Sequence, residues 1–161
     1  RKYFSRALTI RPDSPNVLHS MAILYDEVKE WEKSDEIYLR LINTDSTDAQ
    51  AFNNYAYSLV ERNHKLKRAL TLAKKAITLE PENASYLDTI GWIYFKLDNH
   101  EKAREYIESS IKINGENAIV LEHLGDVLMK IQKTEDALDY YKRALSLDKD
   151  NARLINKVSP E

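Results

Sequence analysis

The sequence predicts an all-α protein built from stacked pairs of antiparallel helices. Small residues recur at a fixed spacing, with Ala22, Ala56, Gly91 and Gly125 lying 34, 35 and 34 residues apart. Around each of them, apolar residues follow the i, i+3, i+4, i+7 spacing of a buried helix face. Glycine and proline number only 3 and 4 in 161 residues, which is few for an all-β or loop-rich chain. A fixed period of this length predicts a solenoid, in which each unit packs on its neighbours.

The period divides the chain into four repeats with a partial unit on either side. The four repeats occupy residues 15–48, 49–83, 84–117 and 118–151. The second is one residue longer, and we place the insertion in its polar turn, 62–67, because surface turns tolerate insertions best. Residues 1–14 are expected to form the second helix of an upstream repeat, and residues 152–161 a capping helix and tail. The apolar residues expected to cover the fourth repeat are Leu154, Ile155 and Val158.

Each repeat is expected to contain two amphipathic helices joined by a short polar turn. The apolar face of the first helix is Leu18, Met21 and Tyr25; Phe52, Tyr55 and Leu59; Leu87, Ile90 and Tyr94; and Leu121, Leu124 and Leu128 in the four repeats. The second helices carry a small residue near their start, at Ser34, Ala69, Ala103 and Ala137. Thr134, followed by Glu135 and Asp136, is expected to be the N-cap of the last of them.

Gly91 lies in the middle of a predicted helix face, between Ile90 and Tyr94. A glycine inside a helix destabilises it by up to about 1 kcal/mol relative to alanine. Two packed helices approach to about 8–10 Å, and a small residue at the crossing allows the shorter distance. We therefore expect Gly91 to face Ala103 on the second helix of its own repeat.

Composition excludes several classes of protein. The net charge of -2 gives no basic surface of the kind that binds nucleic acid, so we expect no nucleic-acid partner. The absence of cysteine excludes disulfides, zinc-thiolate sites and cysteine nucleophiles. No apolar run approaches the roughly 20 residues that span a bilayer, so we expect no membrane insertion by this segment. The cytoplasm and the periplasm both remain open as the compartment. The chain starts without an initiator methionine, and we expect it to be part of a longer protein.

The residues of catalysis do not form a recognisable pattern. The four histidines are His19, His64, His100 and His123, and they share no metal-ligand spacing. The sequence has no glycine-rich phosphate loop, no HExxH motif and no nucleophile elbow. Carboxylates alternate with Lys and Arg in segments such as EKAREYIES, where they are typical of i, i+4 pairs on a solvent face. We therefore expect no enzymatic activity, no metal and no cofactor.

The repeats resemble the tetratricopeptide repeat (TPR) family. Residues 84–117 carry Leu87, Ile90-Gly91, Tyr94, Ala103 and Ile107 at the family's positions. Residues 118–151 carry Leu121, Leu124-Gly125, Ala137, Tyr141 and Ala144, and residues 49–83 carry Phe52, Tyr55-Ala56, Ala69, Ala76 and Pro81. The first repeat departs furthest, with Ser34 and Leu41 where alanine is usual. The resemblance implies a right-handed α-solenoid, the TPR superhelix, whose first helices line a concave groove that binds peptides. The repeats also resemble those of bacterial members.

The resemblance assigns positions 2, 5, 6, 9, 12 and 13 of each repeat to the groove. Large apolar residues stand at these positions beside amides. The candidate partner-binding residues are Trp92, Phe95, Tyr57, Asn53, Asn54, Ile23 and Met129. Our hypothesis is that the aromatic residues hold an apolar anchor and that the two asparagines bind the main chain of a partner segment. The alternative is that the aromatic residues pack between neighbouring first helices and only fill the inner wall.

One specialised groove is not expected. Co-chaperone members of the family hold a C-terminal carboxylate in a clamp made of asparagine and basic residues. Of the residues at the clamp positions in either register, only Asn54 matches, and the two required cations are missing. The sequence thus predicts a non-catalytic protein–protein interaction module that binds a protein or peptide partner in the groove. The alternative is a structural scaffold that self-associates through the solenoid ends, with Phe4 and Leu8 as the contacts at the N-terminal end.

Overall fold

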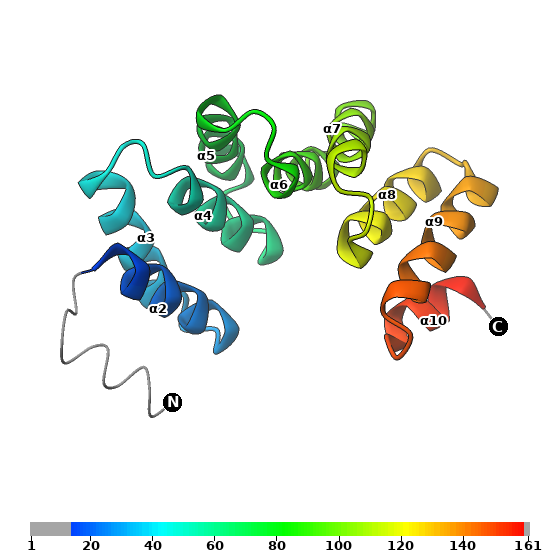
Figure 1. The fold of residues 1–161 in the computed structure, drawn as a ribbon, viewed down its shortest axis with the longest axis horizontal. Coiled ribbons are helices and arrows are strands. Elements are labelled where there is room, and N and C mark those ends of the chain that lie inside the picture. Colours follow the sequence, from blue (N-terminus) through cyan, green and yellow to red (C-terminus); the bar gives the residue numbers. More distant parts are fainter. Residues whose placement is uncertain (1–13, 160–161) are drawn as a thin grey trace.

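The computed structural model describes residues 14–159, and within them the chain forms nine helices and no strand (Figure 1). In chain order they are α2 (Pro15–Glu27), α3 (Trp31–Thr44), α4 (Ala49–Glu61), α5 (Leu66–Leu79), α6 (Ala84–Lys96), α7 (His100–Ile113), α8 (Ala118–Lys130), α9 (Thr134–Leu147) and α10 (Ala152–Val158). None of these helices is long and apolar enough to cross a membrane. The expected helix over residues 1–14 lies outside the described residues, except for Ser14, which caps α2.

The helices form an arch of consecutive pairs. Within the pairs, α2 packs on α3, α4 on α5, α6 on α7 and α8 on α9. Neighbouring pairs are joined by contacts of α3 with α4, of α5 with α6 and of α7 with α8, and α10 packs on α9. Figure 1 shows α2, α4, α6 and α8 along the inner side of the arch, and α3, α5, α7 and α9 along its outer side. The predicted fold class, an all-α solenoid of antiparallel helix pairs, is confirmed.

The start of each first helix is fixed by one polar side chain. Ser14, Asp48, Asn83, Asn117 and Asn151 precede α2, α4, α6, α8 and α10, and each accepts a hydrogen bond from a backbone N–H of the helix's first turn. Such a cap satisfies a backbone donor that has no partner inside the helix. The expected N-cap at Thr134 is wrong by one residue. Thr134 is already helical, and Lys133 occupies the cap position without a side-chain hydrogen bond.

The turns inside the pairs explain the unequal repeat length. The turn between α4 and α5 covers residues 62–65, whereas the other three turns cover 28–30, 97–99 and 131–133. Each turn places one residue in the left-handed region, at Lys29, Asn63, Asp98 and Gln132. The longer turn adds a second one, Lys65, with φ of 47°. The insertion therefore lies in the turn where the sequence predicts it.

Small residues stand where the paired helices cross. Ser34, Ala69, Ala103 and Ala137 are fully buried, and Ala22 and Ala56 are too. A Cβ atom added to Gly91 would lie 3.1 Å from the carbonyl oxygen of Ala103 and 2.6 Å from Cγ1 of Ile107. The expected approach of Gly91 to Ala103 is thus confirmed, with Ile107 as a second and closer neighbour.

Helix α10 covers the C-terminal end of the described solenoid. Leu154 is fully buried and Val158 packs partly against the core. Ile155, which was expected to help cover the fourth repeat, is exposed, so this part of the expectation is wrong. A helix lying on a flat neighbour buries only one stripe of side chains, and Ile155 is 100° away from Leu154 around the axis, by the roughly 100° rotation per residue of an α-helix.

Candidate partner-binding site

A hollow of about 350 Å³ opens on the concave side between α4, α6, α8 and α10. Its lining residues are Tyr57 and Glu61; Trp92, Phe95 and Lys96; Ile119, Glu122, His123 and Asp126; and Arg153 and Lys157. All those on α4, α6 and α8 occupy positions that the family resemblance assigns to the groove. Because the capped first helices keep one register from repeat to repeat, equivalent positions of successive helices face the same space.

Stacked rings form the floor of this hollow. Trp92 is only 8% exposed. Its ring stacks on Phe95 of the same helix at 4.7 Å and on His123 of α8 at 4.0 Å. The indole N–H donates to Glu61 at 3.1 Å, and the ammonium of Lys96 lies 4.6 Å from the ring centroid. Trp92 therefore joins α4, α6 and α8 and presents little of its own surface.

His123 is held in one orientation by a buried carboxylate. Its Nδ1 lies 3.0 and 3.1 Å from the two carboxylate oxygens of Asp88. Both residues are buried. A carboxylate only accepts hydrogen bonds, so Nδ1 carries the proton and donates it. Nε2 has no partner within the described residues and remains available at the hollow.

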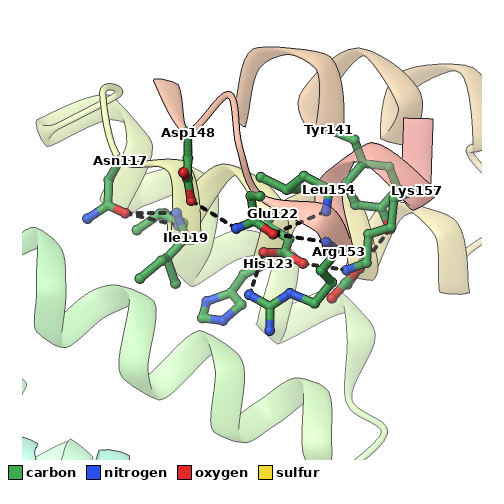
Figure 2. A network of polar contacts seen from close by, with 12 residues as sticks. Asn117, Ile119, Glu122, His123, Tyr141, Asp148, Arg153, Leu154 and Lys157 are labelled. Carbon is green, nitrogen blue, oxygen red and sulfur yellow. Dashed lines mark hydrogen bonds and ion pairs between the residues drawn. The ribbon is translucent and has the colours of Figure 1, made fainter. Parts of the chain in front are cut away.

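An ion-pair network forms the C-terminal wall of the hollow (Figure 2). The buried carboxylate of Glu122 accepts from Arg153 at 2.9 Å and from Lys157 at 2.7 Å. Lys157 also donates to Asp126 at 2.5 Å, and Asp126 accepts from the Tyr141 hydroxyl at 2.7 Å. These contacts attach α10 to α8, and they leave the Arg153 side chain 67% exposed. Burial and the charge of Asp126 raise the pKa of Tyr141, so its hydroxyl stays a donor.

Tyr57 supplies an unused donor on the opposite side. Its hydroxyl forms no hydrogen bond within the part of the chain that the structure describes. Burial raises the pKa of Tyr57 to about 12, with the negative charges of Glu61 and Asp88 adding to the rise. The phenol is therefore neutral at ordinary pH and able to donate to a carbonyl or carboxylate oxygen.

The structure brings some of the sequence candidates together and separates others. Tyr57, Trp92 and Phe95 share the hollow. Asn53 and Asn54 lie nearer the start of α4 and do not line it. The side-chain nitrogen of Asn53 lies 3.5 Å from Oδ1 of Asn54, and its own oxygen is buried without a protein partner.

Ile23 and Met129 are exposed and lie outside the hollow. Ile23 lines a smaller depression on α2 with Ser20, Leu24 and Glu27. The described residues contain no group of three or more His, Asp or Glu side chains that could hold a metal ion. The hollow is thus lined by aromatic rings and hydrogen-bonding groups, and the candidate residues Tyr57, Trp92 and Phe95 are among its lining residues.

The sequence places Asp88, Glu122 and His123 at groove positions, but it does not reveal the Asp88–His123 pair, the ion pairs of Glu122, or the two cations of α10. Asp88 and His123 stand at positions 5 and 6 of consecutive repeats, and this offset was a usable signal of contact between neighbouring first helices. The pairing of Glu122 with Arg153 and Lys157 had no such signal, because α10 is too short to show a repeat.

The stacked helix pairs make this chain a helical-repeat protein with a hollow on its concave side. The family model of the tetratricopeptide repeat matches residues 9–156, and the chain belongs to this family. The resemblance stated from the sequence is thereby confirmed. The family consists of protein-interaction modules.

Two curated relatives show how far the likeness extends. The chain is 27% identical to the human Cell division cycle protein 16 homolog over 119 residues, which cover 68% of this chain and 19% of that protein. It is also 27% identical to the type IV pilus assembly protein PilF of Pseudomonas aeruginosa over 107 residues, covering 66% and 42%. The chain therefore spans less than half the length of either relative.

Solved structures agree with the fold. The structure of Pseudomonas aeruginosa PilF superposes with a TM-score of 0.77 at 26% identity, covering 96% of this chain and 70% of that one. The first TPR of Spaghetti (RPAP3), solved bound to the HSP90 peptide SRMEEVD, gives a TM-score of 0.64 at 21% identity, covering 71% and 90%. The second likeness supports the fold alone.

Proposed function

We propose that the chain is a non-catalytic interaction module, part of a larger protein, that binds a peptide or partner segment in its concave groove. The observation that carries the proposal is the hollow between α4, α6, α8 and α10, where a stacked-ring floor meets unused hydrogen-bonding groups. Small recognition sites commonly combine an apolar floor with a few placed polar groups. Bacterial origin stays a prediction from the repeats, since the relatives include a human and a bacterial protein.

The arrangement suits an apolar or aromatic anchor beside a peptide main chain. Phe95 and the exposed Ile119 offer apolar surface for the anchor side chain. The Tyr57 hydroxyl can donate to a peptide carbonyl, and Nε2 of His123 can accept from a peptide N–H. Asn53 and Asn54 extend the same groove along α4 and would bind the next residues of the main chain. The missing clamp cations argue against a chaperone C-terminal carboxylate as the ligand.

The hollow is better suited to recognition than to catalysis. Asp88 holds His123 in the tautomer that a general base would use. The lining residues, however, include no serine, threonine or cysteine that such a base could activate, and the described residues include no group of three or more side chains that could bind a metal ion. The Asp88–His123 pair then serves to fix the ring on which Trp92 stacks.

Selection of a peptide ligand followed by a matched pair of substitutions tests the proposal. A phage-displayed peptide library is selected on the full chain, and the affinity of the best peptide is measured by fluorescence anisotropy. Ile119→Glu places a charge at the mouth of the hollow. Ile113→Glu is the control, because Ile113 is 51% exposed, close to the 49% of Ile119, but lies outside the hollow.

We expect Ile119→Glu to weaken the peptide by about tenfold or more, as for loss of an interface anchor, and Ile113→Glu to leave it unchanged. With Trp31 replaced by phenylalanine, the emission of Trp92 reports directly on the hollow, since the chain has two tryptophans. Trp92→Ala should abolish binding once circular dichroism shows the variant folded. Equal affinities of the two glutamate variants, or failure to select any peptide, would refute groove binding.

Self-association through the solenoid ends is the second candidate. The specific observation in its favour is that Leu24 on α2 and Val28, the residue that follows this helix, are exposed. Phe4 and Leu8, the contacts expected from the sequence, lie outside the described residues. The scaffold predicts a mass that rises with concentration in analytical ultracentrifugation and that falls back to the monomer in the Leu24→Glu, Val28→Glu double variant. A constant monomeric mass would reject it.

A further inference from the structure

Helix α5 differs in charge from every other outer helix of the arch. Its sequence, LKRALTLAKKAITL, holds four cations and no carboxylate. The other outer helices, α3, α7 and α9, each mix cations with several carboxylates. We define the α5 basic face as Lys67, Arg68, Lys74 and Lys75. In a chain with a net charge of -2, this concentration of positive charge is local.

The four cations lie on one side of the helix. A rotation of about 100° per residue places them, with Thr71 and Thr78, within an arc of about 120°. All six side chains are exposed. The hydroxyls of Thr71 and Thr78 donate to the backbone carbonyls of Lys67 and Lys74, at 3.1 and 2.8 Å. Figure 1 shows α5 on the outer side of the arch, and no residue of α5 lines the hollow.

The cations of the α5 basic face are not neutralised within the molecule. In residues 14–159, no ion pair involves any of the four. The guanidinium of Arg68 lies 5.5 Å from the ring of Tyr55, and this is its one contact with an aromatic ring among the described residues. Lys67 and Arg68 also stand in the first turn of α5, where the positive end of the helix dipole disfavours cations. The repulsion among these cations, and between two of them and the helix dipole, is therefore unfavourable in the isolated chain. An anionic partner would reduce this repulsion.

We propose that the α5 basic face docks a short acidic segment of a partner protein. The face is about 12 Å long, from the eight residue steps between Lys67 and Lys75 at about 1.5 Å each. The neighbouring outer helices carry exposed carboxylates, at Glu32 and Glu36 on α3 and at Glu101 and Glu105 on α7. A nucleic acid or an anionic membrane surface extends beyond α5, so its negative phosphates would be repelled by the carboxylates of α3 and α7. A protein segment with its acidic residues confined to about 12 Å meets only the cations.

A decaglutamate peptide serves as the probe, with decaglutamine as the neutral reference. Binding to the full chain is followed by fluorescence anisotropy at low ionic strength, where screening is weak. The test variant is Lys67→Glu, Lys74→Glu, Lys75→Glu. Three charge reversals on exposed side chains should weaken the binding of decaglutamate by about tenfold or more.

The control variant reverses three exposed lysines of the fourth repeat and so changes the net charge equally. These are Lys133, Lys142 and Lys149. We expect the control to bind decaglutamate within about twofold of wild type, because its lysines are mixed with carboxylates. Circular dichroism verifies the fold of both variants.

Three results would overturn the proposal. One is the absence of measurable binding of decaglutamate to the wild type. Another is an equal loss in the two triple variants, which would make the effect one of net charge. The third is tighter binding of phosphatidylserine vesicles or of a single-stranded oligodeoxynucleotide than of decaglutamate, with loss in the α5 variant, which would assign the face to lipid or nucleic acid.

Discussion

Gly91→Ala should destabilise the chain even though alanine is the better helix former. The new Cβ would lie 2.6 Å from Cγ1 of Ile107, 3.1 Å from the Ala103 carbonyl oxygen and 3.2 Å from the Ile107 backbone nitrogen. Two of these atoms belong to the backbone of α7, so relief requires α7 to move as a whole. Ile107 is fully buried in the core, so its side chain cannot move away from the new Cβ into solvent.

The magnitude follows from two opposing terms. Overpacking of a buried contact costs about 1–3 kcal/mol. Replacing a mid-helix glycine by alanine returns up to about 1 kcal/mol. We expect a net loss of about 1–2 kcal/mol in the free energy of unfolding, and a midpoint of thermal unfolding lower by about 4 °C for a chain of this size.

Gly115→Ala is the matched control for this measurement. A Cβ at Gly115 would meet the Ile111 carbonyl oxygen at 3.3 Å and the Ile111 Cγ2 at 3.8 Å, with nothing closer. Its φ is not positive, so alanine can adopt the same backbone conformation. Urea unfolding followed by circular dichroism should place this control within about 0.5 kcal/mol of wild type. If Gly91→Ala is as stable as Gly115→Ala, the glycine does not set the distance between α6 and α7.

Two further predictions concern the hollow. Burial raises the pKa of the Tyr57 hydroxyl from 10.0 to about 12, so this hydroxyl loses its proton at lower pH in the unfolded chain than in the folded one. The free energy of unfolding should therefore fall as pH rises from about 10 to about 12. Urea titrations across this range should show a smaller fall for Tyr57→Phe. Glu122→Gln removes the charge that binds Arg153 and Lys157, so we expect α10 to lose about 1–2 kcal/mol of local stability. Hydrogen exchange of the α10 backbone amides should then be roughly tenfold faster. In the control Glu116→Gln, at an exposed site, the α10 amides should exchange as in wild type.

The sequence was sufficient for the fold because the same information occurs four times. A single glycine such as Gly91 could mark a turn, a kink or a crossing, but Ala22, Ala56 and Gly125 at the same offset leave only the crossing. The cap residues follow the period as well, at Asp48, Asn83 and Asn117. The prediction placed the N-cap at Thr134, one residue after the actual cap Lys133, because a hydroxyl followed by two acidic residues satisfies the N-cap rule. The repeat period does not resolve a shift of one residue.

The candidate site was predictable in position but only partly in character. The family's groove positions identified Tyr57, Trp92 and Phe95, which do line one hollow. Periodicity predicts the direction of a side chain, but it does not predict the fraction of its surface that a neighbouring helix buries. His123 covers Trp92 because Asp88 holds the imidazole against the indole, which is a contact between helices 35 residues apart in sequence. Such pair geometry is fixed only when α6 and α8 are placed in space.

Charge pairing differs between the two proposed binding faces of the arch, so the two proposals predict different responses to salt. On the concave side Glu122 and Asp126 are already neutralised by Arg153 and Lys157, so a ligand there gains from ring contacts and hydrogen bonds. On the convex side the four cations of the α5 basic face have no such partners, so a ligand there gains from charge. Added salt screens exposed charges over about 10 Å or less, but it changes buried apolar contacts little. A salt titration of the selected peptide and of decaglutamate should therefore separate the two sites, with a steep loss of affinity for decaglutamate alone. Equal salt dependence of both ligands would mean that they share one surface.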